Sequence, residues 1–175
     1  MQALAFWKAV TVDHADFLGT LISLLDQLDV KYCVIGGQGV NAYVEPLVSL
    51  DLDLALAAGE VKRILPVLEE RFSVEDFPHS VNLSLDNSKL RVQLQTDPRY
   101  ARFTEHAQIR DVLGLQLPVA SLEDVLQGKV WAASDATLRP TKRRKDMLDI
   151  ARIIEAHPEL RCRVPNELLD RLAEP

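Results

Sequence analysis

The chain has 175 residues, of which 47% are hydrophobic and 26% charged, a composition typical of a globular protein and unlike that of a disordered one. This length supports one full hydrophobic core but not two domains of ordinary size. The formal net charge of -6 argues against a general nucleic-acid coat protein, because binding to phosphate backbones draws on a surplus of Lys and Arg.

The cysteines and the N-terminal segment bear on the compartment. Only Cys33 and Cys162 are present, without a CxxC pair or a nearby His cluster, so neither a disulfide framework nor a zinc site is indicated. We therefore expect a reducing, cytoplasmic location. The opening MQALAFWKAV contains a short apolar stretch, but Asp13 follows well before a membrane-spanning length is reached. We expect no signal peptide and no membrane span.

The first patterned segment is an amphipathic helix over residues 15–28. Its apolar residues recur at helical spacing: Phe17, Leu18, Leu21, Ile22, Leu25 and Leu28. A β-rich run over residues 31–35 then stops at Gly36 and Gly37, which indicates a buried strand that ends in a tight turn. A short helix over residues 40–44 is expected to follow.

The clearest strand covers residues 50–56, where leucines alternate with Asp51, Asp53 and Ala55. Two carboxylates separated by one strand residue project from the same face, with their stems roughly 7 Å apart. That spacing allows both to share a divalent cation, and Mg²⁺ prefers such hard oxygen ligands. The alternative is that both Asp side chains simply solvate the outer face of a half-exposed strand.

The middle of the chain predicts a helix and further strands. Residues 60–71 read as a helix in which Pro66 leaves a break or a kink, followed by a short strand over 72–75. Two strand-like runs, 81–85 and 90–95, are joined by turn-forming residues and predict an antiparallel hairpin.

From Pro98 onward the pattern becomes mainly helical. A short helix after Pro98 precedes an extended stretch over 109–119, which Gly114 interrupts and Pro118 closes. Ser121, followed three residues later by an acidic residue, is typical of a capped helix start. A further helix is predicted from Pro140 to about residue 157, and a last short one carries Leu168, Leu169 and Leu172.

The string GGQGVNAYVEPLVSLDLDL resembles the signature of nucleotidyltransferases of the DNA polymerase β superfamily, in which a glycine turn precedes a strand carrying Asp-x-Asp. By motif position the resemblance implies that Gly36 and Gly37 hold a nucleoside triphosphate, with Ser49 matching a commonly seen hydroxyl. It also implies that Asp51 and Asp53 bind the catalytic Mg²⁺ or Mn²⁺ ions.

A second resemblance lies in the C-terminal half. A helix bearing Lys129, followed by KRRKDMLD, is similar to the Lys and Lys-Asp-x-x-Asp elements of toxin-type nucleotidyltransferases of bacterial abortive-infection and toxin-antitoxin systems. This similarity implies that Lys129, Lys145 and Asp146 face the nucleotide, with Lys129 offsetting negative charge that develops in catalysis. Alternatively, Lys145 and Asp149 form an ordinary surface ion pair at i,i+4 spacing.

One position departs from the family pattern. The family supplies a third metal carboxylate from the adjoining strand, where KLRVQLQTD places Gln93. An amide oxygen can ligate a cation, yet it adds no negative charge and cannot accept a proton from the acceptor. Asp97 lies on the same face of an ideal strand and compensates only if that strand bends.

The expected fold is α/β (α+β), a nucleotidyltransferase-like mixed sheet of four or five strands flanked by helices. Residues 1–120 would form the core, and residues 121–175 a helical extension packed on it.

Three functions remain open at this point. The first is a Mg²⁺-dependent enzyme that moves a nucleoside monophosphate to a hydroxyl on protein or RNA. The second is a catalytically degenerate relative that acts as a nucleotide-binding regulator or a toxin-antitoxin partner, and the third is a plain interaction module. Four arginines would bind an anionic partner in the first two functions. Alternatively, they are ordinary solvated surface residues. They are Arg91, Arg99, Arg102 and Arg110.

Overall fold

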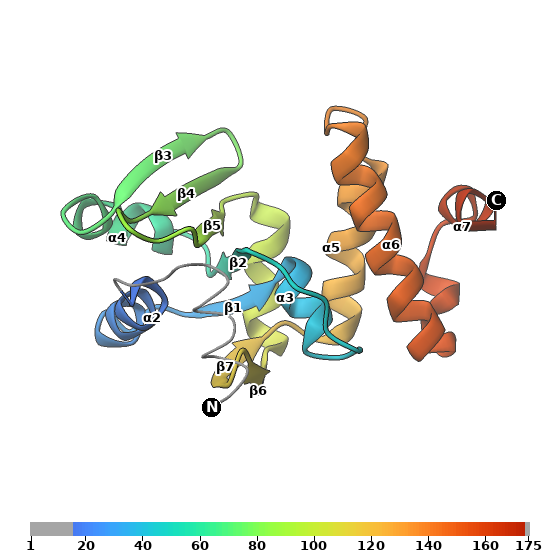
Figure 1. The fold of residues 1–175 in the computed structure, drawn as a ribbon, viewed down its shortest axis with the longest axis horizontal. Helices are drawn as coiled ribbons and strands as arrows, with labels where there is room; N and C mark the ends of the chain where they lie inside the picture. Colours follow the sequence, from blue (N-terminus) through green and yellow to red (C-terminus); the bar gives the residue numbers. More distant parts are fainter. Residues whose placement is uncertain (1–15, 174–175) are drawn as a thin grey trace.

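The computed structural model describes residues 16–173, which form one seven-stranded mixed sheet with helices on both of its faces (Figure 1). The strand order is β3-β4-β5-β2-β1-β7-β6. The strands are β1 (Tyr32–Ile35), β2 (Asp51–Leu56), β3 (Ser73–Phe77), β4 (Ser80–Ser84), β5 (Arg91–Gln95), β6 (Gln108–Val112) and β7 (Leu115–Val119). The prediction for the opening ten residues lies outside the described part of the chain.

Six α-helices and two 3₁₀ segments connect and cover these strands within residues 16–173. They are α2 (Phe17–Gln27), α3 (Gly36–Asn41), α4 (Glu60–Glu69), η1 (Pro98–His106), α5 (Leu122–Ser134), α6 (Pro140–Ala156), η2 (Pro158–Arg163) and α7 (Asn166–Ala173). Among residues 16–173, none of the helices combines the length and the apolar character that crossing a membrane requires.

The sheet has more strands than the four or five expected from the sequence. The stretch over residues 109–119, expected to be extended with an interruption at Gly114, is the hairpin β6–β7, which turns at Leu113 and Gly114 with φ of 59° and 83°. Positive φ at both central residues is the geometry of a two-residue hairpin turn, and a leucine there gives little sequence signal for it. Pro118 lies inside β7, opposite Ile109.

The central strands agree with the sequence pattern. β2 pairs antiparallel with β1 and parallel with β5, and β4 pairs antiparallel with β5 as the predicted hairpin requires. On β2, Leu52 and Leu54 are fully buried, while Asp51 and Asp53 alternate with them and face the opposite side of the sheet.

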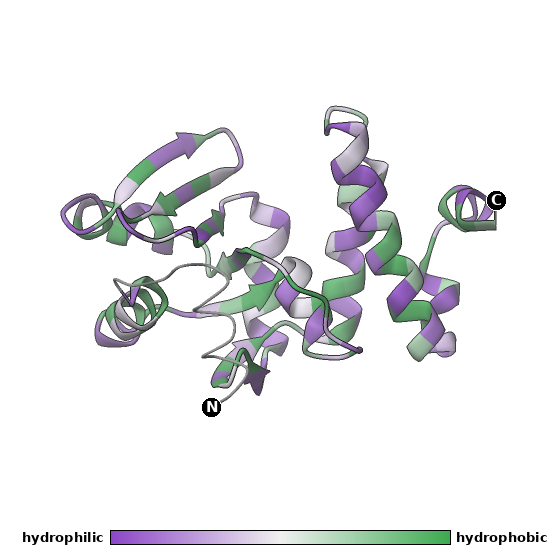
Figure 2. Cartoon of the chain, viewed as in Figure 1, coloured by the Kyte–Doolittle hydropathy of each residue, from purple (hydrophilic) through white to green (hydrophobic). Residues whose placement is uncertain are grey.

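Each face of the sheet has its own hydrophobic core. The first core joins the inward leucines of β2 to α2 and α4, where the rings of Phe17 and Phe72 lie 5.0 Å apart. The second core joins Ile35 and Ala55 to η1, α5 and α6. Figure 2 shows hydrophobic and hydrophilic bands alternating along α5 and α6, as expected for helices with one buried side. The division of the chain at residue 120 stays a prediction, and the second core draws side chains from both sides of it.

The residues at the helix N-termini explain where several of the helices begin. The Ser121 hydroxyl accepts a hydrogen bond from the Asp124 amide at 3.2 Å, and α6 begins at Pro140, both as predicted. The helix expected over residues 40–44 instead begins at Gly36, where φ is +64° and β1 has just ended. The glycine turn and the helix start therefore coincide.

Candidate functional site

A cleft of about 730 Å³ opens on the face of the sheet that carries the second core. Its lining includes Asp53 and Gln93 from the strands and Gly36 from the turn after β1. Lys129 of α5 and Asp146 of α6 line it from the helical side. The fold thus gathers into one cleft side chains that are far apart in the sequence.

Asp53 lies at the centre of this arrangement. Its register neighbours are Ile35 on β1 and Gln93 on β5. A Cβ atom built on Gly36 would lie 2.0 Å from the Asp53 Oδ2 atom, so only glycine allows the turn to approach the carboxylate this closely. Burial raises the pKa of the Asp53 carboxyl, and the positive charge of Lys129 partly offsets that effect.

Asp51 occupies the rim, at the first residue of β2. Its side chain is 38% exposed, and its Oδ1 atom accepts a hydrogen bond from Arg91 Nε at 2.9 Å. The Ser49 hydroxyl lies 3.4 Å from the Asp51 amide nitrogen, and the Ser49 carbonyl accepts a hydrogen bond from the buried Gln38 side chain at 3.3 Å. A cation bound to Asp51 would therefore compete with Arg91.

Lys129 is buried between two carboxylates of α6. Its Nζ atom lies 2.9 Å from Asp146 Oδ1 and 2.7 Å from Asp149 Oδ2. Burial alone would lower the pKa of Lys129, but attraction to Asp149 and Asp146 outweighs it and raises the pKa to about 12. Lys129 is therefore charged near neutral pH and does not act as a base.

Two lysines near the start of α6 differ in their position relative to the cleft. Lys142 lies 3.7 Å from Asp146 Oδ2 and lines the cleft. Lys145 is exposed and is not among the residues that line the cleft, although its positive charge acts to lower the pKa of Asp53. Asp149, the candidate partner of Lys145 in the surface-pair interpretation, is buried and paired with Lys129 and Arg152 instead.

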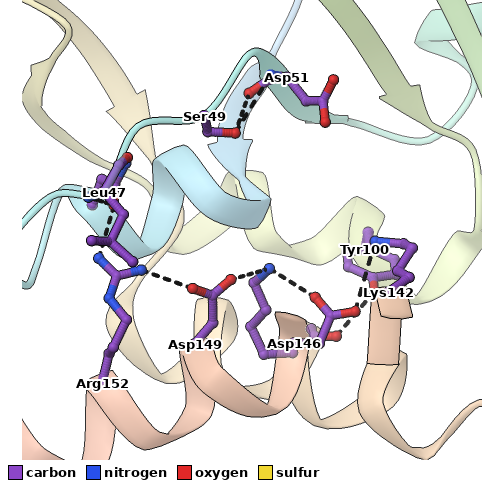
Figure 3. Close-up of polar contacts among 11 residues, drawn as sticks. Leu47, Ser49, Asp51, Tyr100, Lys142, Asp146, Asp149 and Arg152 are labelled. Atoms are coloured by element: carbon purple, nitrogen blue, oxygen red, sulfur yellow. Dashed lines mark hydrogen bonds and ion pairs between the residues drawn. The ribbon is translucent and has the colours of Figure 1, made fainter. Parts of the chain in front are cut away.

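Arg152 connects this buried cluster to the loop that leads into β2 (Figure 3). Its guanidinium donates to Asp149 Oδ1 at 2.8 Å, to Asn41 Oδ1 at 3.0 Å and to the Glu45 carbonyl at 2.6 Å. The Asn41 side chain in turn bonds the backbone N–H and C=O of Leu47, at 3.0 and 2.7 Å. A continuous chain of polar contacts thus runs from the cleft wall to the approach of Asp51.

Sequence reasoning missed this connection. A signal was present, since Asp146 and Asp149 are spaced i,i+3 beside Met147 and Ile150 and so share the apolar side of the helix. A pair of acidic residues on a buried helix face requires buried cationic partners. Nothing in the local sequence identified Lys129 and Arg152 as those partners.

Gln93 lies directly opposite Asp53 in the parallel β2–β5 register. Asp97 also lines the cleft, but its carboxylate accepts the Arg99 backbone N–H at 3.0 Å and pairs with the Arg99 side chain at 2.7 Å. Within residues 16–173, no group of three or more His, Cys, Asp or Glu side chains is arranged to hold a metal ion. Asp51, Asp53 and Gln93 offer hard oxygens, two carboxylates and one amide, that fit a divalent cation with less negative charge than three carboxylates provide.

No protein-family model matches the chain, and no curated protein matches it in sequence. Solved structures do match it in fold. The antibiotic-resistance factor ANT(2'')-Ia is 15% identical, with 83% of this chain and 90% of that chain covered and a TM-score of 0.53.

Two further structures show the same likeness. The lincosamide antibiotic adenylyltransferase LnuA, bound to lincomycin, is 15% identical over 82% of this chain and 99% of that chain, with a TM-score of 0.55. An antigenic nucleotidyltransferase-like protein from Paracoccidioides brasiliensis is 17% identical over 85% of this chain and 75% of that chain, with a TM-score of 0.51. At such identities the likeness shows the fold, and the activity has to be argued from the site.

Proposed function

We propose that this chain, which has the nucleotidyltransferase fold, moves a nucleoside monophosphate from a nucleoside triphosphate to an acceptor hydroxyl. The sequence resemblance implies protein or RNA as the carrier of that hydroxyl. One observation supports the proposal above all: Asp53 lies against the Gly36 turn, on the same face of β2 as Asp51 and within a cleft that Lys129 and Lys142 line from the helical side. Such a site suits a phosphate chain accompanied by a divalent cation.

In this proposal Asp51, Asp53 and the amide oxygen of Gln93 hold Mg²⁺ or Mn²⁺. The ion, when bound, neutralises phosphate oxygens and favours attack at phosphorus. Gly36 and Gly37 leave room for the phosphates beside the carboxylates, since neither carries a side chain.

The helical wall supplies positive charge to the transferred phosphoryl group. Lys129 is held charged and in place by Asp146 and Asp149, so its ammonium is fixed at the cleft wall, although these two carboxylates offset its positive potential. Lys142, whose side chain is 51% exposed at the cleft, is the more accessible cation. We assign Asp146 the task of orienting both lysines, while Lys145 contributes long-range charge from the surface.

The reaction forms a bond between the acceptor oxygen and the α-phosphorus and breaks the bond from that phosphorus to the bridging oxygen of pyrophosphate. The acceptor proton leaves to water, because Gln93 cannot accept it and Asp97 is engaged by Arg99. Phosphoryl transfer depends mainly on positioning and on charge stabilisation, so a weak base is compatible with turnover.

A degenerate nucleotide-binding protein, acting as a regulator or a toxin-antitoxin partner, is the second candidate. Gln93 stands where a third carboxylate would face Asp53, and Arg91 already neutralises Asp51. Both features lower the negative charge available to hold two cations. In this alternative the cleft binds a nucleotide without transferring it.

Calorimetric titration with each nucleoside triphosphate and Mg²⁺, together with transfer of α-³²P label to protein, RNA or water, tests the proposal. We expect binding that Asp51→Ala abolishes, and label transfer that Asp53→Asn abolishes. Binding that survives Asp51→Ala contradicts the metal site of the transferase proposal. Binding without any label transfer supports the degenerate protein, and in that case Gln93→Glu is expected to restore transfer while Gln116→Glu on β7 is not.

A further inference from the structure

The row of side chains that continues from Asp53 across the sheet passes through two side-chain amides before it reaches Glu75 on β3. Asp53 pairs in register with Gln93 on β5, and Gln93 pairs with Asn82 on β4. The next row runs from Gln95 to Ser80 and on to Phe77 of β3. Side chains in register on neighbouring strands share one face, so these rows form a surface beside the carboxylate. We name Phe77, Ser80, Asn82, Gln93 and Gln95 the amide face, and all five line the cleft.

The amide face has unused hydrogen-bonding capacity. Asn82 Oδ1 is buried without a hydrogen-bond partner, and the Gln93 side chain forms no hydrogen bond within the described part of the chain. Gln95 Oε1 accepts the Asp97 N–H at 3.1 Å, which fixes the amide and leaves its two Nε2 protons for another partner. A buried polar group without a partner is destabilising, so it calls for a ligand or ordered water.

The position of the amide face points to the acceptor rather than to the phosphates. Gly36 and β1 lie on one side of Asp53, and β5 and β4 extend from the other side (Figure 1). A phosphate chain seated over the glycine turn therefore leaves the amide face open to the second substrate.

The chemistry of the amide face selects the kind of acceptor. Carboxamides offer both donors and acceptors, which matches hydroxyl groups that both donate and accept. None of the five side chains carries a charge, so a polycation or a phosphate backbone would find counter-charges only at the margins of the amide face, at Glu75, Asp97 and Arg99. Phe77 is 47% exposed at the end of the second row and offers an apolar surface for C–H groups. The cleft volume also lies in the range of small-molecule sites.

We propose that the amide face is the acceptor subsite and that it takes a small, uncharged, hydroxyl-rich molecule of the saccharide class. This inference rests on the proposed nucleotidyl transfer and replaces the protein or RNA acceptor that the sequence resemblance implied. Each side-chain amide that bonds the acceptor contributes about two- to tenfold in affinity.

Ligand-observed NMR on the full chain tests this inference, with sucrose, trehalose and raffinose as neutral probes, tobramycin as a cationic probe and a short oligoribonucleotide as the nucleic-acid probe. We expect at least one saccharide to bind, and Asn82→Ala and Phe77→Ala each to weaken that binding about two- to tenfold. Gln108→Ala, on the exposed opposite edge strand β6, is the matched control and should leave it unchanged. Phe77→Ala alters an exposed side chain, so it keeps the test informative if Asn82→Ala unfolds.

Three results would overturn the inference. The first is that no saccharide binds, and the second is that neither Asn82→Ala nor Phe77→Ala weakens saccharide binding. The third is that tobramycin or the oligoribonucleotide binds more tightly than the saccharides and that both variants weaken this binding. Titration of the same samples with ATP and Mg²⁺ separates the two proposals. Saccharide binding without nucleotide binding sinks the transferase proposal and leaves the amide face as a saccharide-binding site without an acceptor role. Nucleotide binding that Asp51→Ala abolishes, without saccharide binding, sinks only the acceptor assignment.

Discussion

At Gly36 two constraints act on a single residue. The backbone has φ of +64°, a value that residues other than glycine rarely adopt, and a Cβ atom there would overlap Asp53. Gly37 differs, because a Cβ atom on it would meet Ser49 Oγ at an ordinary contact distance of 3.6 Å. The two adjacent glycines therefore have different structural tasks, which the sequence GG does not distinguish.

We predict that Gly36→Ala lowers the free energy of unfolding by at least about 1–2 kcal/mol, the cost of the left-handed conformation. It should also abolish nucleotide binding by displacing the Asp53 carboxylate. Urea denaturation and calorimetry measure the two effects. Gly37→Ala serves as the control, and equal losses in both variants would show that Gly36 has no special contact with Asp53.

Lys129 holds two buried carboxylates, so we predict that Lys129→Met lowers the free energy of unfolding by about 3–5 kcal/mol, the usual cost of leaving a buried charge without its partner. Lys142→Met, at a half-exposed position beside the same Asp146, should cost no more than about 1 kcal/mol.

The pH dependence of this ion pair follows from the sign of the shift. Folding raises the pKa of Lys129 from 10.5 to about 12, so its stabilisation is fully present below pH 10.5 and is lost as the pH rises through 12. Urea denaturation should therefore show a constant difference between wild type and Lys129→Met from pH 7 to pH 10. A difference that disappears within that range would show that Lys129 loses its proton there.

Helix α6 contributes both to the hydrophobic core and to the wall of the cleft, because its buried side carries an apolar stripe and the two acidic partners of Lys129. The sequence predicted its start and its amphipathic character from Pro140 and the spacing of apolar residues. Its connection to the loop before β2, through Arg152, is a contact between residues more than a hundred positions apart. Periodicity cannot report such a contact.

We predict that Arg152→Ala accelerates amide hydrogen exchange in residues 42–50, because that loop loses its attachment to α6 through Asn41 and Glu45. Arg152→Lys should restore only part of the protection, since one ammonium cannot make the contacts of the guanidinium fork. Arg144→Ala, at an exposed position of the same helix, is the control. Unchanged exchange in residues 42–50 of Arg152→Ala would show that Gln38 and Asn41 hold the loop by themselves.

For the whole molecule, the second core decides whether the predicted core domain can fold alone. That core contains Cys33 and Ile35 together with Leu126 and Ile150, so a fragment ending at residue 120 would expose the cleft face of the sheet. Burial raises the pKa of the Cys33 thiol to about 12, which protects it from thiol reagents in the intact chain.

We predict that residues 1–120 alone do not unfold cooperatively and that their single thiol, Cys33, reacts rapidly at pH 8. The intact chain carrying Cys162→Ser provides the reference, because Cys162 is the exposed cysteine and its removal leaves only Cys33 to report. Thiol titration and urea denaturation measure both properties. A cooperative fragment with a protected thiol would establish residues 1–120 as an independent domain.

The sequence by itself determined most of the elements and the residues of the candidate metal site. Alternating leucines set the two faces of β2, the glycine pair ended β1, and the spacing of Asp51 and Asp53 placed both on one face, because these patterns depend on neighbours within a few residues. Gln93 was implied by the family resemblance. Only the tertiary structure decided the strand order, the burial of Lys129 between Asp146 and Asp149, the neutralisation of Asp51 by Arg91, and the amide face beside Asp53. These features depend on register and packing between distant segments, and local periodicity carries no information about which segments meet.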